Sequence, residues 1–164
     1  MVASTIPVPI EFSLPEGWRS VPPDEVGAPE AAFVALRPPA SQGFTTNITI
    51  SGEVRGEDIP LTAVADEVLD RLRTGAREVK VGRRSEVGSP ANPGLTQAVR
   101  MRLDINGRPT DLVQLQVFLG MRDTRDPRRR AVLHIVLTAL PDRFDAVVGE
   151  FQKFLSTIRP EGVR

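Results

Sequence analysis

An Asn-Gly pair at positions 106 and 107 stands between two stretches in which apolar and polar residues alternate. Both residue types adopt the left-handed backbone that a two-residue hairpin turn requires. Residues 95–105 alternate before the pair and residues 110–119 alternate after it, which is the period of a half-buried strand. The sequence therefore predicts an antiparallel hairpin, and the rest of the fold must be built around it.

Further strands are predicted on both sides of this hairpin. Residues 131–139 are apolar on both faces, which is typical of a central strand. Shorter alternating or apolar stretches predict strands over 6–14, 32–36, 47–54 and 78–85. Loops are expected over 38–43, where prolines and glycines gather, and over the charged residues 120–130.

Two helices are predicted, over residues 60–75 and 143–158, because apolar residues recur there at helical spacing. Asp58 and Asp142 are the expected N-terminal caps. Helices that cover a meander of antiparallel strands define the α+β class. We expect a twisted antiparallel sheet of about six to seven strands with two main helices packed on it, in one domain over residues 6–159.

Composition excludes several classes of function. The 21 basic and 21 acidic residues cancel, whereas a nucleic-acid-binding domain usually carries a basic excess. The chain has no cysteine, so thiolate metal sites and a cysteine nucleophile are excluded. Serine-nucleophile motifs, phosphate loops and dinucleotide glycine patterns are absent, and no cofactor is expected. With neither an 18-residue apolar run nor a signal-peptide pattern, the expected location is cytoplasmic.

The order of elements and three short motifs carry a family resemblance. The motifs are Phe12-Ser13-Leu14-Pro15-Glu16-Gly17-Trp18, Phe33-Val34-Ala35-Leu36, and Gly43-Phe44 followed by Asn47-Ile48-Thr49-Ile50. Together they resemble the actinobacterial LpqN/LpqT-type family, and the element order is similar to the PsbP-like and Mog-type α/β/α sandwich that DcrB-like proteins share. The resemblance implies a binding or accessory role. The lipidated cysteine of the lipoprotein members is missing here.

Three other features allow both a functional and a structural interpretation. His134, the only histidine, lies mid-strand, where a histidine held within a sheet face is favoured over a general base. The arginines of 122–130 form either an acidic-partner patch or a solvated loop that Asp123 and Asp126 partly neutralise. Trp18 is either an exposed anchor or a side chain that closes the core, and the second interpretation is favoured.

One face of the predicted meander is the candidate binding surface, because polar and apolar side chains mix there. This face either lines a groove for a peptide or a lipid-like ligand or packs in the ordinary way under a helix with polar ends at its rim, and the second interpretation is favoured. The candidate partner- or ligand-binding residues on this face are Arg100, Arg102, Gln114, Gln116, Phe118 and His134.

The first hypothesis of function is a non-enzymatic binding module, an adaptor or chaperone-like protein that holds a protein partner. The alternative is a carrier of a small apolar or lipid-like ligand in a groove between sheet and helix. An enzyme is not expected.

Overall fold

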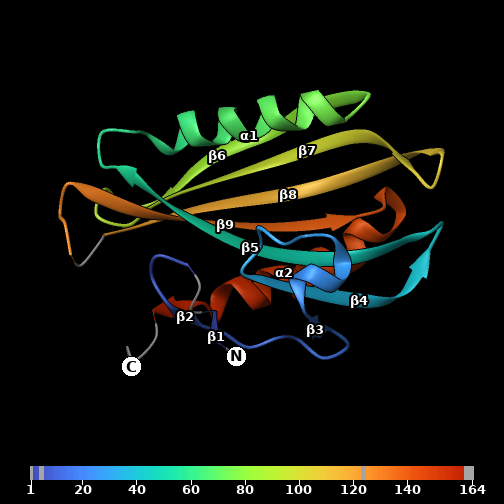
Figure 1. Cartoon of the computed structure of the whole chain (residues 1–164), viewed down its shortest axis with the longest axis horizontal. Helices are drawn as coiled ribbons and strands as arrows, with labels where there is room; N and C mark the ends of the chain where they lie inside the picture. Colours follow the sequence, from blue (N-terminus) through green and yellow to red (C-terminus); the bar gives the residue numbers. More distant parts are fainter. Residues whose placement is uncertain (1, 4–5, 123–124, 161–164) are drawn as a thin grey trace.

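The computed structural model of the chain describes residues 2–3, 6–122 and 125–160. Within them, seven strands form one antiparallel sheet in the order β3-β4-β5-β9-β8-β7-β6 (Figure 1). The strands are β3 (Arg19–Val21), β4 (Phe33–Ser41), β5 (Phe44–Gly56), β6 (Glu78–Gly88), β7 (Pro93–Ile105), β8 (Arg108–Arg122) and β9 (Arg129–Ala139). The predicted α+β class and strand number are confirmed.

Helices α1 (Leu61–Gly75) and α2 (Pro141–Ser156) cover opposite faces of this sheet. A short 3-10 helix, η1 (Pro23–Val26), lies in the connection between β3 and β4. Strands β1 (Val2–Ala3), β2 (Ile10–Glu11) and β10 (Arg159–Pro160) form a small second sheet near the chain ends (Figure 1). The result is a three-layer arrangement in which a long central sheet separates the two helices.

The predicted hairpin is present and sets the register of the two strands that it joins. Asn106 and Gly107 have φ angles of 52° and 78°, and Ile105 pairs with Arg108 directly across the turn. The apolar strand β9 lies between β5 and β8, which explains why both of its faces are buried. The central position predicted for it is confirmed.

The two helices are staggered across the sheet. Helix α1 packs on β6, β7 and β8, whereas α2 packs on β8 and β9 of the other face. The N-terminal segment covers the rest of the α2 face, because Phe12 packs between Phe33 of β4 and Phe154 of α2. Among the described residues, α2 therefore leaves part of β6 and β7 open on its face of the sheet, and α1 leaves part of β5 open on the other face.

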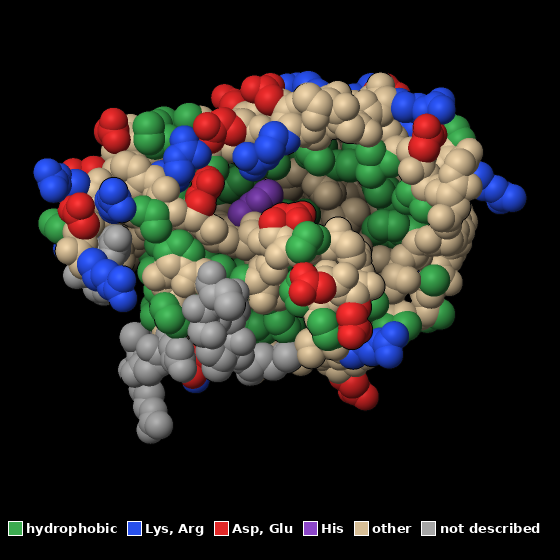
Figure 2. Space-filling model, viewed as in Figure 1, with side chains coloured by type: hydrophobic (Ala, Val, Ile, Leu, Met, Phe, Trp, Pro, Cys, Tyr) green, Lys and Arg blue, Asp and Glu red, His purple; other side chains and the backbone are tan. Residues whose placement is uncertain are grey.

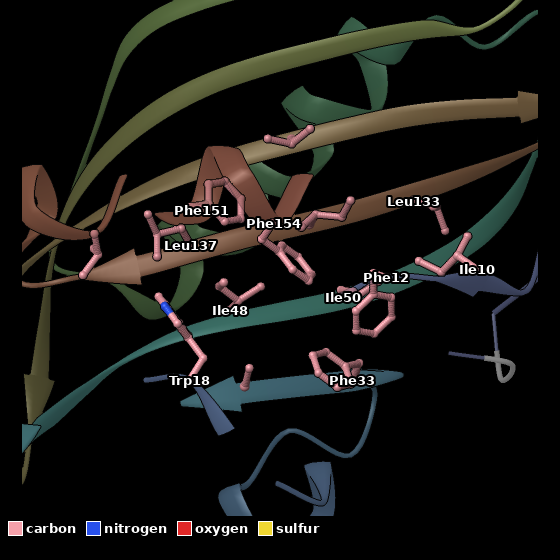
Figure 3. Packing of buried hydrophobic residues seen from close by; sticks show 14 of the residues in the cluster. Ile10, Phe12, Trp18, Phe33, Ile48, Ile50, Leu133, Leu137, Phe151 and Phe154 are labelled. Carbon is pink, nitrogen blue, oxygen red and sulfur yellow. The ribbon is translucent and has the colours of Figure 1, made fainter. Parts of the chain in front are cut away.

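The larger core lies between the sheet and α2. Its buried residues come from the N-terminal segment, from β4, β5, β8 and β9, and from α2. Figure 3 shows the rings of Phe12, Phe33, Phe151 and Phe154 converging with Ile48 and Ile50 in this layer. Each large apolar side chain removed from water contributes roughly 1.5–3 kcal/mol, so we expect this layer to contribute most to the stability of the fold.

Several predicted boundaries were wrong. The strand expected over 6–14 is reduced to Ile10–Glu11, consistent with Pro7 and Pro9, which cannot donate to a ladder. The loop expected over 38–43 is mostly strand, because β4 continues to Ser41 and only Gln42 and Gly43 turn, with positive φ. The loop expected over 120–130 is shorter, because β8 reaches Arg122 and β9 begins at Arg129; residues 123–124, with Asp123, lie outside the described residues.

The predicted helix caps were also wrong. The residue in the cap position of α1 is Pro60 and that of α2 is Leu140, and neither helix has a side-chain cap. Asp142 lies inside the first turn of α2, where a carboxylate still interacts favourably with the helix dipole. Both helix starts therefore depend on proline geometry and packing instead of capping hydrogen bonds.

Candidate binding sites on the two faces of the sheet

The six candidate residues expected on one face are divided between both faces. In the β7–β8 register, Arg100 pairs with Val113 and Arg102 pairs with Asp111. Because opposed residues share a face, both arginines lie on the α2 face. The other four candidates lie on the α1 face: Gln114, Gln116, Phe118 and His134.

On the α1 face, polar side chains form a hydrogen-bonded chain across four neighbouring strands. Gln97 Nε2 donates to Gln116 Oε1 at 2.7 Å, and Gln116 Nε2 donates to Gln114 Oε1 at 2.8 Å. Gln114 Nε2 then donates to Thr138 Oγ1 of β9 at 3.1 Å. At the β6 end, Arg84 Nε donates to Gln97 Oε1 at 2.9 Å.

This chain, which we call the glutamine ladder (Arg84, Gln97, Gln116, Gln114 and Thr138), lies mostly in the interior. Gln97 and Gln116 are fully buried, and Thr138 is buried as well. Burying an amide without a hydrogen-bond partner costs free energy, so the ladder satisfies groups that the packing of α1 removes from water. Gln116 and Phe118 are therefore held inside the fold and do not reach the surface.

His134 extends the polar character of this face toward its uncovered strip. Its ring stacks on Phe118 with centroids 4.5 Å apart and an interplanar angle of 10°. Its Nε2 atom is buried and has no hydrogen-bond partner among the residues that the structure describes. Burial, with a smaller contribution from the charge of Arg71, lowers the pKa of His134 to about 4, so the ring is neutral at pH 7.

A small pocket opens beside His134. It has a volume of about 70 Å³ and lies between α1 and strands β5 and β9; its polar lining residues are Ser51, Glu53, Arg71 and His134. Figure 2 shows the chain's histidine at the bottom of a hollow with charged side chains at its rim. A water occupies about 30 Å³ in the liquid, so this pocket has the size of a solvent site and is far smaller than a typical ligand pocket.

The larger hollow is on the α2 face, in the strip beside the first turn of α2. Two adjoining pockets of about 320 and 410 Å³ share Lys80, Arg100 and Pro141 in their linings. Ala98, Val113 and Phe144 line the second pocket, and Val113 is buried. We call this double hollow the edge groove, because Lys80 and Gly82 belong to β6, the last strand of the sheet.

Charges in the edge groove are mostly paired. Lys80 Nζ lies 3.1 Å from Glu78 Oε1, and Arg102 Nε lies 2.8 Å from Asp111 Oδ1. The hydrogen bond from Arg102 holds the pKa of Asp111 below its usual value. Arg100, which lines both pockets, is exposed and has no ion pair in the described part of the chain. Its charge helps to lower the pKa of Asp111 from a distance, so the groove has one guanidinium at its centre that forms no ion pair with a carboxylate of the described residues.

The structure decides one of the alternatives left open by the sequence and bears on a second. Trp18 is buried and its Nε1 donates to Glu150 Oε1 at 3.0 Å, so it closes the core. In the loop between β8 and β9, Arg128 and Arg129 lie 3.4 and 4.0 Å from the carboxylate of Asp126, so this loop is partly self-neutralised, as expected. Arg122 lies at its start, at the end of β8.

Two residues central to these sites were not anticipated. Gln97 lies opposite Gln116 in the β7–β8 pair. The two-residue turn at 106–107 fixes this register, so counting back from the turn could have identified Gln97. Glu150 accepts hydrogen bonds from both Trp18 and Arg37, but its partners are more than 100 residues away in sequence, so no local pattern could reveal it.

Two classes of feature are not found. The described residues contain no group of three or more His, Asp or Glu side chains that could hold a metal ion. Neither α1 nor α2 has the length and hydropathy that a membrane-spanning helix needs.

A long antiparallel sheet with one helix on each face and a short N-terminal sheet defines a Mog1/PsbP-like α/β fold. No protein-family model matches the sequence, and no curated protein matches it. Several solved structures match this chain at the level of the fold.

LpqN of Mycobacterium tuberculosis, involved in cell envelope biogenesis, aligns with a TM-score of 0.64 and 16% identity over 92% of this chain and 83% of its own. The cyanobacterial PsbP protein of Synechocystis gives a TM-score of 0.55 and 16% identity over 92% and 86%. The Ran-binding protein Mog1p of Saccharomyces cerevisiae aligns with a TM-score of 0.54 and 14% identity over 92% of this chain and 89% of its own. The resemblance read from the sequence is thereby confirmed for the fold.

Proposed function

We propose that this protein is a non-enzymatic binding module, an adaptor or chaperone-like accessory protein that holds a protein partner. The observation that supports this proposal is the edge groove, whose two pockets of about 320 and 410 Å³ are open to solvent beside an edge strand. An open, mixed polar and apolar surface of this kind suits a polypeptide better than an enclosed small molecule.

The likeness to Mog1p adds support of a general kind, because that protein binds another protein, Ran. At 14% identity only the scaffold is shared, and function belongs to sites built on a scaffold. We therefore assign the binding role to surface residues of this chain. Arg100 and Arg102 of the edge groove are the candidates that remain accessible, with His134 at the α1-face pocket.

The alternative, a carrier of an apolar or lipid-like ligand between sheet and helix, has less support. The pocket beside His134 measures about 70 Å³, below the roughly 300–1,000 Å³ of ligand pockets, and the pockets of the edge groove, which reach this range, are open to solvent. Native mass spectrometry of freshly purified protein is the direct test of this alternative. An added mass that disappears on denaturation would favour the carrier over the adaptor.

A photo-crosslinking experiment tests the proposed function. The residue p-benzoylphenylalanine is introduced in place of Lys80, an exposed side chain that lines both pockets, and the protein is irradiated in a lysate of the organism that encodes it. The matched control carries the same residue in place of Arg73, an exposed arginine of α1 on the other side of the sheet. We expect discrete protein adducts from the first position and none of the same mass from the second. Identical patterns from both would contradict a specific partner site in the edge groove.

The cytoplasmic location expected from the sequence remains part of the proposal, and cell fractionation with an antibody against the chain tests it.

A further inference from the structure

The two edges of the sheet differ in what they offer to another chain. At one edge, β3 has three residues; at the other, β6 has eleven. In the described part of the chain, β6 pairs only with β7, so its outer backbone N–H and C=O groups have no strand partner. Such an edge is a template for an added strand.

The first half of β6 is the regular part of this edge. Glu78, Lys80 and Val81 belong to a run that pairs with Arg102 through Val99 without interruption, and the register shifts only between Val81 and Arg84. A bulge of this kind bends a strand and limits pairing. An added strand therefore has its best template over residues 78–81.

The edge groove lies directly beside this template. Glu78 and Lys80 line its first pocket, and Lys80, Val81 and Gly82 line its second. Side chains alternate across an extended segment, so every second side chain of a strand added to β6 would point to the α2 face, where the groove is. The groove can then select those side chains while the backbone pairing supplies the general affinity.

The charge at the centre of the groove indicates which side chains fit. Lys80 and Arg102 already form ion pairs with Glu78 and Asp111, whereas Arg100 forms no ion pair among the described residues and acts on Asp111 only through its charge. Asp145 of α2 also lines the second pocket, but it forms no ion pair with Arg100 or with any other described residue. A carboxylate supplied by the added strand would complete the pairing of the groove.

We propose that β6 and the edge groove bind an extended acidic segment of a partner protein as an eighth strand of the sheet, with a carboxylate of that segment on Arg100. This inference rests on the proposed protein-binding function and specifies its site and the chemistry of its partner.

Two synthetic heptapeptides test the proposal, one alternating valine with aspartate and one alternating valine with lysine. Binding to the full chain is measured by fluorescence anisotropy, and backbone amide hydrogen exchange is measured with and without saturating peptide. We expect the aspartate peptide to bind about tenfold or more tightly than the lysine peptide at low salt. We also expect it to slow exchange at alternate amides of residues 78–81.

The variants are Arg100→Glu and, as a matched control, Arg73→Glu on the other side of the sheet. Arg100 is exposed, so its replacement leaves the fold intact, which circular dichroism verifies. We expect Arg100→Glu to lower the affinity for the aspartate peptide by about tenfold. The control should change this affinity by less than about twofold.

Three results would overturn the proposal: no protection of residues 78–81 by the aspartate peptide at millimolar concentration, equal binding of both peptides, or protection of these amides by a concentration-dependent dimer. If the partner crosslinked from position 80 in lysate is still captured when Arg100→Glu is added, the acidic-segment proposal fails while the binding function stands.

Discussion

The layers that lie between the sheet and each of its two helices are packed with different kinds of side chains. Under α2, the buried cluster is apolar and draws on the N-terminal segment, four strands and the helix. Under α1, the apolar clusters are smaller and are interrupted by the glutamine ladder, which crosses β6 to β9. The α2 layer thus derives its stability from burial, and the α1 layer adds a requirement for matched hydrogen bonds.

The difference teaches how specificity is distributed in this fold. An apolar layer tolerates changes that preserve volume, because no group in it depends on one partner. A buried amide chain tolerates little, because each member left without its partner costs the desolvation of that group. We expect the α2 layer to set how stable the chain is and the α1 layer to fix which register the strands adopt.

The largest predicted effect compares one phenylalanine from each layer. Phe151 and Phe118 are both fully buried. Phe118, however, stacks on His134 and lines a pocket that is large enough for water. We expect Phe151→Ala to lower the free energy of unfolding by about 3–5 kcal/mol, the usual range for a core phenylalanine. Phe118→Ala should cost about 1 kcal/mol less, because water can enter the enlarged pocket. Urea denaturation followed by circular dichroism measures both. A Phe118→Ala cost equal to or above that of Phe151→Ala would contradict the contrast between layers.

The second effect is the pH dependence introduced by His134. Its pKa falls from an ordinary 6.5 to about 4 on folding, so folding requires the neutral ring. The corresponding stability is fully present above pH 6.5 and is lost as the pH falls from 6.5 toward 4. By linkage, the loss at pH 4.5 is about 2–3 kcal/mol.

The measurement is the difference between wild type and His134→Phe, each unfolded in urea at pH 7 and at pH 4.5. Phenylalanine preserves the stacking on Phe118, and the other titrating groups are common to both proteins, so they cancel in the difference. We expect the wild type to lose more stability than the variant on acidification. Equal losses would show that the ring does not resist protonation.

The sequence predicted the elements of the fold better than the assignment of residues to faces. Alternation in 95–105 and 110–119 identified the strands, and the apolar run of 131–139 identified the central one. Arg100 and Arg102 were nevertheless placed on the wrong face, because alternation within one strand says nothing about which residue lies opposite. A two-residue turn at Asn106 and Gly107 makes Ile105 face Arg108, and counting back from it would have placed both arginines correctly.

Other parts of the sites could not be predicted from sequence, for physical reasons. The stacking of Phe118 on His134 depends on the β8–β9 register, and no short turn fixes that register. The edge groove depends on the stagger of α1 and α2 across the sheet, which is a property of tertiary packing. His134 was expected to be satisfied within the sheet, yet its Nε2 has no hydrogen-bond partner in the described part of the chain, and a sequence pattern cannot show this.

The third prediction tests whether the glutamine ladder acts as a unit. Gln116→Leu leaves the amide nitrogen of Gln97 without its main acceptor in a buried place, so it should cost about 2 kcal/mol. Replacing both Gln97 and Gln116 by leucine removes the two buried partners together and should cost less than the single change. A double-mutant cycle in urea measures the coupling. Additive costs would mean that the two amides do not depend on each other.

The smallest effect concerns the paired charges of the edge groove. Arg102 and Asp111 are hydrogen-bonded at 2.8 Å, and this bond holds the pKa of Asp111 below its ordinary value. Both side chains are about half exposed, and ion pairs in contact with solvent contribute little to stability. We therefore expect Arg102→Gln to raise the pKa of Asp111 while leaving the urea midpoint at pH 7 within experimental error.

Carboxyl ¹³C chemical shifts followed through an acid titration measure the first effect, and denaturation measures the second. Arg77→Gln is the matched control, because it breaks an exposed pair with Asp104 and should not change the titration of Asp111. A lowered folded-state pKa means that any stability from the pair is present at neutral pH and is lost as the pH falls. A large fall in the urea midpoint of Arg102→Gln at pH 7 would show that the charge of Arg102 contributes to the stability of the fold. An unchanged midpoint would leave it available to a partner, in contrast with the buried amides on the other face.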